Sequence, residues 1–179
     1  GNVPRGQAGS KTVQLTAKNG RFEPHFLIAN VGDTLELIDG GPEIHNPNVP
    51  FFANMTPSAM VPAGANQKIL LTSPEPGVVP IGCNIHKWMK AYLLVQDHPF
   101  VTVSEADGSI KIEGLPAGHD LGFRAWHESG VIDGRELANG IVFRKGRFDL
   151  VLQPGTNDFG DVVIPAQTFH SDRTCGSSS

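Results

Sequence analysis

The sequence is poor in charge and in long apolar runs, and each shortage excludes a class of protein. Charged residues make up only 18% of the 179 residues, and 14 Lys plus Arg against 18 Asp plus Glu give a formal net charge of -4. Nucleic acids and anionic membranes both need a dense basic surface on their partner, so we expect neither as a partner. No apolar stretch approaches the roughly 20 residues of a membrane-spanning helix, so we also expect no membrane span.

The motifs of the common enzyme classes are missing as well. The sequence has no phosphate-binding loop, no dinucleotide fingerprint and no hydrolase-type nucleophile turn. We find no internal repeat and no coiled-coil heptad. Cysteine is scarce: Cys83 lies mid-chain and Cys175 close to the end, and their spacing does not favour a disulfide.

Glycine and proline are abundant instead, with 21 and 14 copies, so the chain is broken often. Between these breaks, apolar residues alternate with polar ones, which is typical of half-buried strands. The residues between Pro47 and Ala65 lack this period and are expected to form a long loop. We therefore predict an all-β fold, with the clearest early strands at residues 13–17, 35–37, 69–71 and 92–95.

A break near Asp97-His98-Pro99 divides the pattern into two domains and a tail. We predict a first domain over residues 1–97, a second, smaller β-sandwich over 98–168 and a flexible tail over 169–179. An Asp107-Gly108 turn flanked by alternating apolar residues predicts a hairpin. Strands of the second domain are expected at residues 101–103, 110–112, 121–125, 141–143, 148–152 and 161–164.

One short segment carries most of the chemistry. Cys83, His86 and Met89 provide a thiolate, an imidazole and a thioether within seven residues, and His45 offers a second imidazole upstream. Two His nitrogens and one Cys sulfur, with a weak axial Met, form the ligand set of blue-copper electron-transfer sites. Structural zinc usually takes Cys and His alone, so the Met favours copper.

These motifs resemble the cupredoxin family, in particular the small bacterial plastocyanin- and amicyanin-like type 1 copper proteins. The resemblance rests on Cys-x-x-His-x-x-Met at residues 83–89, the His45-Asn46 pair, Phe22-Glu23-Pro24 and the turn at residues 31–34. It implies a Greek-key β-sandwich and one copper ion held by three donors with Met89 axial. It also implies that polar groups of Asn46 tie the His45 loop to the Cys83 loop.

The downstream part looks similar to a carboxypeptidase regulatory-like β-sandwich, a family without a defined activity. The residues that carry this second resemblance are Ala106-Asp107-Gly108, residues 115–118 and Trp126-His127-Glu128. Histidines here, at positions 98, 119 and 127 together with Glu128 and Asp133, match no metal-ligand spacing, so we expect them to be structural.

The cupredoxin resemblance implies that electrons leave through the edge of His86, inside an apolar patch. Trp88 is expected to form part of a docking or interdomain surface there. Four further side chains fit either that surface or core packing, and the sequence does not choose between the two: Phe51, Phe52, Met55 and Met60.

We therefore predict a protein that transfers single electrons between redox partners through copper at His45, Cys83, His86 and Met89, and not an enzyme. The partner is expected to dock near His86 and Trp88. The alternative is a copper carrier or sensor without redox turnover, and a metal-free scaffold is disfavoured because all four donors are present. The resemblance implies a periplasmic or secreted protein, from which we expect a signal peptide to have been removed.

Overall fold

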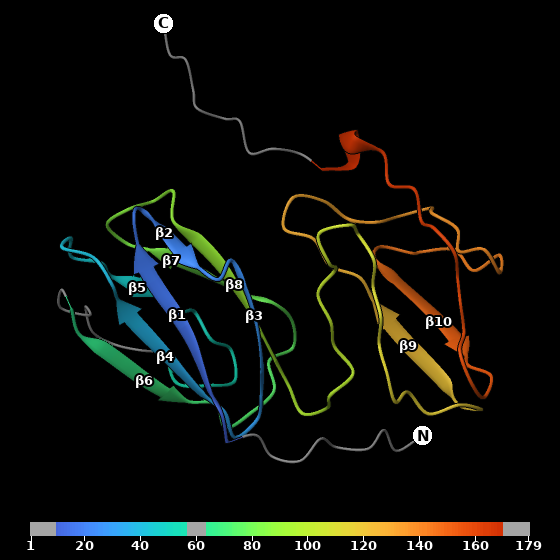
Figure 1. Cartoon of the computed structure of the whole chain (residues 1–179), viewed down its shortest axis with the longest axis horizontal. Coiled ribbons are helices and arrows are strands. Elements are labelled where there is room, and N and C mark those ends of the chain that lie inside the picture. The colour runs from blue at the N-terminus through green and yellow to red at the C-terminus, as the bar shows by residue number, and fades with distance from the viewer. Residues whose placement is uncertain (1–9, 57–63, 170–179) are drawn as a thin grey trace, which may run out of the picture. The chain divides into compact units, whose positions relative to one another are not determined.

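Strands form the regular structure of the chain, as the sequence predicts (Figure 1). The computed structural model describes residues 10–56 and 64–169, and within these ranges it contains no α-helix. The all-β prediction is therefore confirmed. The elements are β1 (Thr12–Lys18), β2 (Arg21–Glu23), β3 (Phe26–Asn30), β4 (Thr34–Asp39), β5 (Pro47–Asn48), β6 (Asn66–Leu70), β7 (Val79–Cys83), β8 (Lys90–Gln96), β9 (Asp120–Arg124), β10 (Arg147–Val151) and the 3-10 turn η1 (Ala166–Thr168).

The first eight strands form two four-stranded sheets. One has the order β2-β1-β4-β6 and the other the order β3-β8-β7-β5, so the chain passes repeatedly from one sheet to the other. Each sheet has one parallel pair, the central pair β1 and β4 in the first and the edge pair β3 and β8 in the second, and the other pairs are antiparallel. Buried side chains from both sheets join in one hydrophobic core, so the sheets pack as a sandwich.

Alternation along the strands decides which side chains enter that core, because successive residues of a strand point to opposite faces. In β4 the inward row is Leu35 and Leu37, and in β8 it is Ala91, Leu93 and Val95. These rows follow the alternation in the sequence. The early strands expected at residues 13–17, 35–37 and 92–95 lie within β1, β4 and β8, and residues 69–71 overlap the end of β6.

Backbone contacts divide the chain between Glu113 and Gly114. The regular sheet of the second unit is the antiparallel pair β9 and β10, whose Leu121 and Leu150 belong to a small core cluster. The strands expected at residues 121–125 and 148–152 correspond to this pair. Elsewhere in the described part of this unit, pairing is limited to isolated bridges such as that of Glu136 with Val142.

Residues 101–112 form the expected turn but not the expected strands. The N–H of Gly108 donates to the carbonyl of Glu105 over 2.9 Å, which closes the Asp107-Gly108 turn. The flanking apolar side chains are exposed, Val103 to 48% and Ile110 to 67%. Alternation produces a strand only where one face is buried, and here neither row finds a core. Residues 161–164 likewise form no strand.

Several features expected from the sequence fall on parts of the chain outside the described residues. These are Met60, Cys175 and the tail from residue 170 onward. Within the described residues, no helix has the length and apolar character needed to cross a membrane.

A buried carboxylate braces the segment that follows β5. Glu75 is only 4% exposed, and its two oxygens accept backbone N–H bonds from Phe52, Ala53 and Asn54 at 3.0–3.1 Å. The Asn54 side chain completes the arrangement by donating to Glu75 and accepting from the N–H groups of Thr72 and Ser73. Ionised acceptors form the stronger hydrogen bonds, so this carboxylate fixes a loop that has no regular structure of its own.

We predict that Glu75→Ala lowers the free energy of unfolding by about 2–4 kcal/mol, because it leaves three backbone donors without their acceptor. Urea unfolding monitored by tryptophan fluorescence measures the change. Glu113→Ala is the matched control, since the Glu113 side chain is 75% exposed. Equal stability of the two variants would contradict the bracing role.

A row of polar side chains crosses the sheet formed by β2, β1, β4 and β6. Glu36 of β4 lies opposite Gln14 of β1 and Lys68 of β6. The Gln14 amide donates to Glu36 over 2.9 Å, and the Lys68 ammonium lies 3.5 Å away. The hydrogen bond from Gln14, followed by the charge of Lys68, holds the pKa of the Glu36 carboxyl below its ordinary value of 4.5.

This lowered pKa predicts a pH dependence of stability. A carboxyl with a lowered folded-state pKa contributes stability above its unfolded pKa, and this contribution disappears as the pH falls through the folded-state pKa. The wild type is therefore expected to lose more stability than Glu36→Gln between pH 6 and pH 3. Urea midpoints across this range test the difference; parallel curves for both proteins would refute it.

Candidate metal centre

Strand alternation places the Cys83 side chain inside the sandwich. Val79, Ile81 and Cys83 are the buried residues of β7, while Pro80 and Gly82 point to the other face. Cys83 is 4% exposed and belongs to the core cluster. The last inward position of this strand is therefore a thiol, at the end where the chain leaves the sheet.

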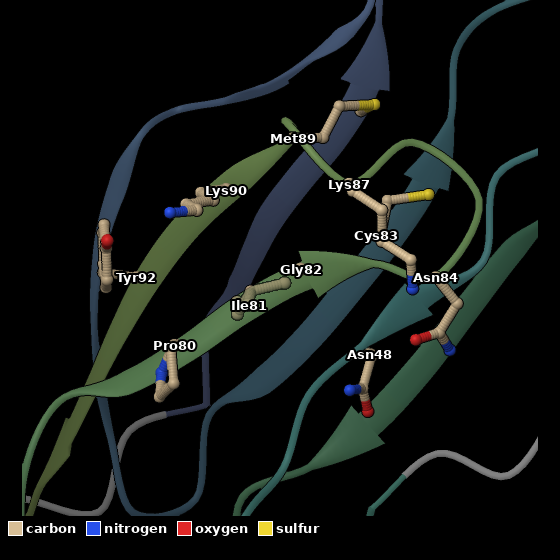
Figure 2. Close-up of a pocket in the computed structure, with 10 residues that line it drawn as sticks. All are labelled: Asn48, Pro80, Ile81, Gly82, Cys83, Asn84, Lys87, Met89, Lys90 and Tyr92. Atoms are coloured by element: carbon tan, nitrogen blue, oxygen red, sulfur yellow. The ribbon is translucent and has the colours of Figure 1, made fainter. Parts of the chain in front are cut away.

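Met89 enters the same interior from the next strand. It precedes β8 and continues the inward row of Ala91 and Leu93, with an exposure of 1%. The antiparallel register pairs Ile81 with Ala91. The pairing ends at Gly82 with Lys90, so Cys83 and Met89 follow directly, one at each end of the loop that joins the strands. Figure 2 shows both residues at the two ends of this loop.

The loop itself is folded around the cysteine sulfur. The backbone N–H of His86 points at Cys83 Sγ over 3.4 Å, and His86 Nδ1 lies 3.8 Å from the same sulfur. The N–H of Met89 donates to the carbonyl of His86 over 3.0 Å. These two turns bring one imidazole nitrogen beside the thiol.

The segment that carries His45 is tied to this loop by backbone groups. The N–H of Asn46 points at Cys83 Sγ over 3.5 Å, and the carbonyl of Asn46 accepts from the N–H of Asn84 at 2.9 Å. Pro47 of β5 pairs with Cys83 of β7. The link expected at Asn46 is therefore present, and the groups that form it belong to the main chain.

His45 lies beside His86 and is fully buried. The two ring centroids are 5.1 Å apart, with an angle of 53° between the ring planes. His45 Nε2 is buried and has no hydrogen-bond partner within the described structure. A buried polar atom of this kind needs an explanation, and a soft metal ion bound by imidazole, thiolate and thioether provides one. The donor set thus fits copper.

In this structure the four predicted ligands do not all converge on one point. Among the residues that it describes, no three His, Cys, Asp or Glu side chains converge into a group that could hold a metal ion. It brings Cys83 together with His86, and the ring of His86 together with that of His45. Met89 joins them through its buried position and its backbone bond to His86.

Sequence reasoning missed Asp39, which lies against His45. Asp39 Oδ1 is 3.1 Å from His45 Nδ1, and both side chains are essentially inaccessible to solvent. The signal was present in the alternation of β4, because Leu35, Leu37 and Asp39 share the inward face. An acidic residue in phase with two buried leucines marks a buried carboxylate.

The side chains around the loop are partly apolar and exposed. Trp88 is 69% exposed, and its ring centroid lies 5.2 Å from that of His86. Phe52 and Met55 are also exposed, to 86% and 83%, whereas Phe51 packs against the core. Ile44 and Ile85, at 54% and 47%, are further exposed apolar residues that sequence reasoning did not select.

An open depression of about 340 Å³ lies beside the loop (Figure 2). Gly82 leaves room for it, because no atom lies within 4 Å of the position that a Cβ would occupy. Lys87 and Lys90 are among its lining residues and give it a basic character.

The other histidines of the described chain have local roles. His98 Nδ1 accepts from the N–H of Phe100, and His127 Nδ1 accepts from the N–H of Ser129. The His127 ring also packs on Phe169, with the centroids 4.3 Å apart. His119 is exposed.

Comparison with known proteins gives low-identity similarities to solved structures alone. No family model matches the chain, and no curated protein matches it. A reduced amicyanin variant is 19% identical with a TM-score of 0.41, and covers 47% of this chain and 81% of its own. A copper-containing nitrite reductase from Thermus scotoductus is 22% identical with a TM-score of 0.40; the match covers 46% of this chain and 22% of that protein.

The solved structures that the chain resembles over about half of its length thus include those of an amicyanin and a copper nitrite reductase. A resemblance to small copper proteins is what the sequence predicted. The expected resemblance of the second unit to carboxypeptidase regulatory-like domains is not addressed by these similarities and stays a prediction.

The indole of Trp88 anchors the loop, since its Nε1 donates to the carbonyl of Gly20 over 3.0 Å. We predict that Trp88→Phe, which keeps a ring but loses this bond, destabilises the protein by about 0.5–1.5 kcal/mol. Amide hydrogen exchange in residues 84–88 should become faster. Phe52→Leu serves as the control, because it changes another exposed aromatic side chain, which lies outside residues 84–88. Unchanged exchange in Trp88→Phe would show that the bond does not hold the loop.

Proposed function

We propose that this protein is a mononuclear copper protein that carries single electrons between redox partners. The observation that supports the proposal best is the arrangement around Cys83 Sγ. Two backbone N–H groups point at this sulfur, and the imidazole of His86 lies 3.8 Å from it. His45, Cys83, His86 and Met89 would hold the copper, and the bound ion would supply one-electron chemistry between Cu(II) and Cu(I).

The chain's own groups prepare this site in three ways. The backbone N–H groups of Asn46 and His86 point at the Cys83 sulfur, and contacts of this kind orient a metal ligand. Burial of Cys83 and Met89 keeps water away from the sulfurs. Backbone bonds between the two loops limit their movement, and a rigid frame needs little rearrangement when the charge of the site changes.

The partially exposed His86 edge is the proposed route for electrons. Its neighbour Trp88 is largely exposed, and exposed apolar side chains at a site usually mark a contact surface. We propose that the redox partner docks there. In the proposed function no substrate bond is broken, so we do not propose an enzyme. We also propose that the protein acts in the periplasm or outside the cell, as the cupredoxin resemblance implies.

A copper carrier is the second candidate. Met55 is 83% exposed in a loop near the end of the first described range, where a thioether is accessible to a passing Cu(I) ion. A carrier gives its metal to a competing protein or chelator, whereas an electron-transfer protein keeps it through repeated oxidation and reduction. Retention of copper over redox cycles separates the two functions.

We predict an intense thiolate-to-copper absorption band and a narrow hyperfine splitting when one equivalent of Cu(II) is added to the purified protein. Both signatures should be lost in Cys83→Ala, because the thiolate is the source of the band. Met55→Leu is the matched control and should keep the spectrum of the wild type. A pale spectrum that Cys83→Ala leaves unchanged would sink the electron-transfer function.

A further inference from the structure

The paired strands of the second unit carry arginine next to phenylalanine three times. Residues 143–148 read Phe-Arg-Lys-Gly-Arg-Phe, and the neighbouring strand β9 ends in Phe123-Arg124. The middle of the first segment is a two-residue turn, in which Lys145 and Gly146 have φ values of 50° and 77°. Such turns join directly paired strands, so the residues on either side of them lie opposite each other.

Backbone pairing places three arginines in one row across this unit. Arg147 of β10 lies opposite Arg124 of β9 on one side and opposite Arg144 on the other, where backbone hydrogen bonds of 2.7 and 3.0 Å close the turn. Directly opposite residues point to the same face of a sheet, with their Cβ atoms about 4.5–5.5 Å apart. The three side chains of this arginine row therefore share one face, and all three residues are exposed.

A row of phenylalanines on the other face supports the arginine row. The chain neighbours of the three arginines are Phe123, Phe143 and Phe148, and the ring centroid of Phe148 lies 5.1 Å from that of Phe123 and 4.7 Å from that of Phe143. Phe143 is buried, and the other two rings pack against the small core cluster of this unit. Successive residues of a strand point to opposite faces, so the segment has one apolar and one cationic face.

The arginine row is unfavourable for the fold itself. Like charges directly opposite each other on neighbouring strands are destabilising. Among the described residues, none of the three guanidinium groups has an ion-pair or side-chain hydrogen-bond partner. Lys145 adds a fourth positive charge at a turn position where Asn, Asp or Gly is favoured. Stability does not explain these four cations, and departures of this kind are expected at functional sites.

The charges around the row limit what it can bind. Residues 114–169 contain five Lys and Arg residues against seven Asp and Glu, and four of the five cations are those of the arginine row and Lys145. On the same face, Asp149 and Asp120 follow the row along the two strands. An extended polyanion such as a nucleic acid or an anionic membrane would meet these carboxylates, so the row suits a short anionic segment.

We propose that the arginine row is a docking site for an acidic segment of a partner protein. Each guanidinium offers a planar pair of N–H donors that fits a carboxylate. Small molecules bind mainly in concave sites, whereas a row of exposed side chains on a strand face is an open surface, which favours a protein partner. This inference concerns the second unit and does not depend on the proposed copper function.

The test measures how a fluorescently labelled peptide of glutamates binds to the full chain, by fluorescence polarisation at low ionic strength. We expect saturable binding that weakens as salt is added, because exposed charges are screened. Arg147→Gln removes the centre of the row and should weaken binding by about 3–10-fold. Arg21→Gln is the matched control, because it removes the same charge from a side chain that is 70% exposed in β2, and it should bind like the wild type.

Urea unfolding of Arg147→Gln separates docking from a structural role. The substitution relieves like-charge repulsion within the row, so the variant should be at least as stable as the wild type. A clear loss of stability would show that Arg147 serves the fold, and would overturn the proposal.

The binding measurements can overturn it in two further ways. A wild type that does not bind the glutamate peptide, or two variants that bind it equally well, removes the docking site. Single-stranded DNA or phosphatidylserine vesicles that bind more tightly than the peptide, and lose affinity in Arg147→Gln, exclude an acidic protein as the partner. Uptake of copper is measured separately, so its failure would leave this result standing.

Discussion

Two backbone N–H groups directed at one sulfur connect the separate parts of the candidate centre. Asn46 belongs to the segment before β5 and His86 to the loop after β7, yet both point at Cys83 Sγ. The bond from Asn84 to Asn46 and the pairing of Pro47 with Cys83 hold the two segments at this distance. Without this link, His45 and His86 would belong to independent loops, and their rings would have no reason to lie side by side.

Strand alternation explains how much of the centre the sequence could reveal. Cys83 and Met89 continue the inward rows of β7 and β8, so a period-two reading alone predicts that both sulfurs face the core. Asp39 follows from the same rule applied to β4. The role of Glu75 cannot be predicted in this way, because Glu75 lies outside the alternating strands. Its role depends on the distant loop at residues 52–54, whose N–H groups reach the carboxylate only in the folded chain. Alternation shows which face of a strand is buried, but it does not show which distant residues contact that face.

The part of the chain that follows β8 shows the limit of the same rule. Residues 101–112 alternate well and contain a good turn, but Val103 and Ile110 remain exposed. In β9 and β10, by contrast, Leu121 and Leu150 pair across the strands and share a small core. A local sequence pattern states a preference, and the preference becomes a strand where another strand and a buried face are available. Neither condition can be read from the segment itself.

The donors of the candidate centre are unequally distributed along the chain, and this affects how metal and folding are coupled. Cys83, His86 and Met89 lie within seven residues, whereas His45 precedes Cys83 by 38 positions. If copper binds as proposed, the unfolded chain would already hold three of its donors close together. A ligand stabilises a fold only through the difference between its affinities for the folded and the unfolded chain. His45 is the donor that folding would add to the proposed site, so any stabilisation by bound copper would depend mainly on one buried imidazole.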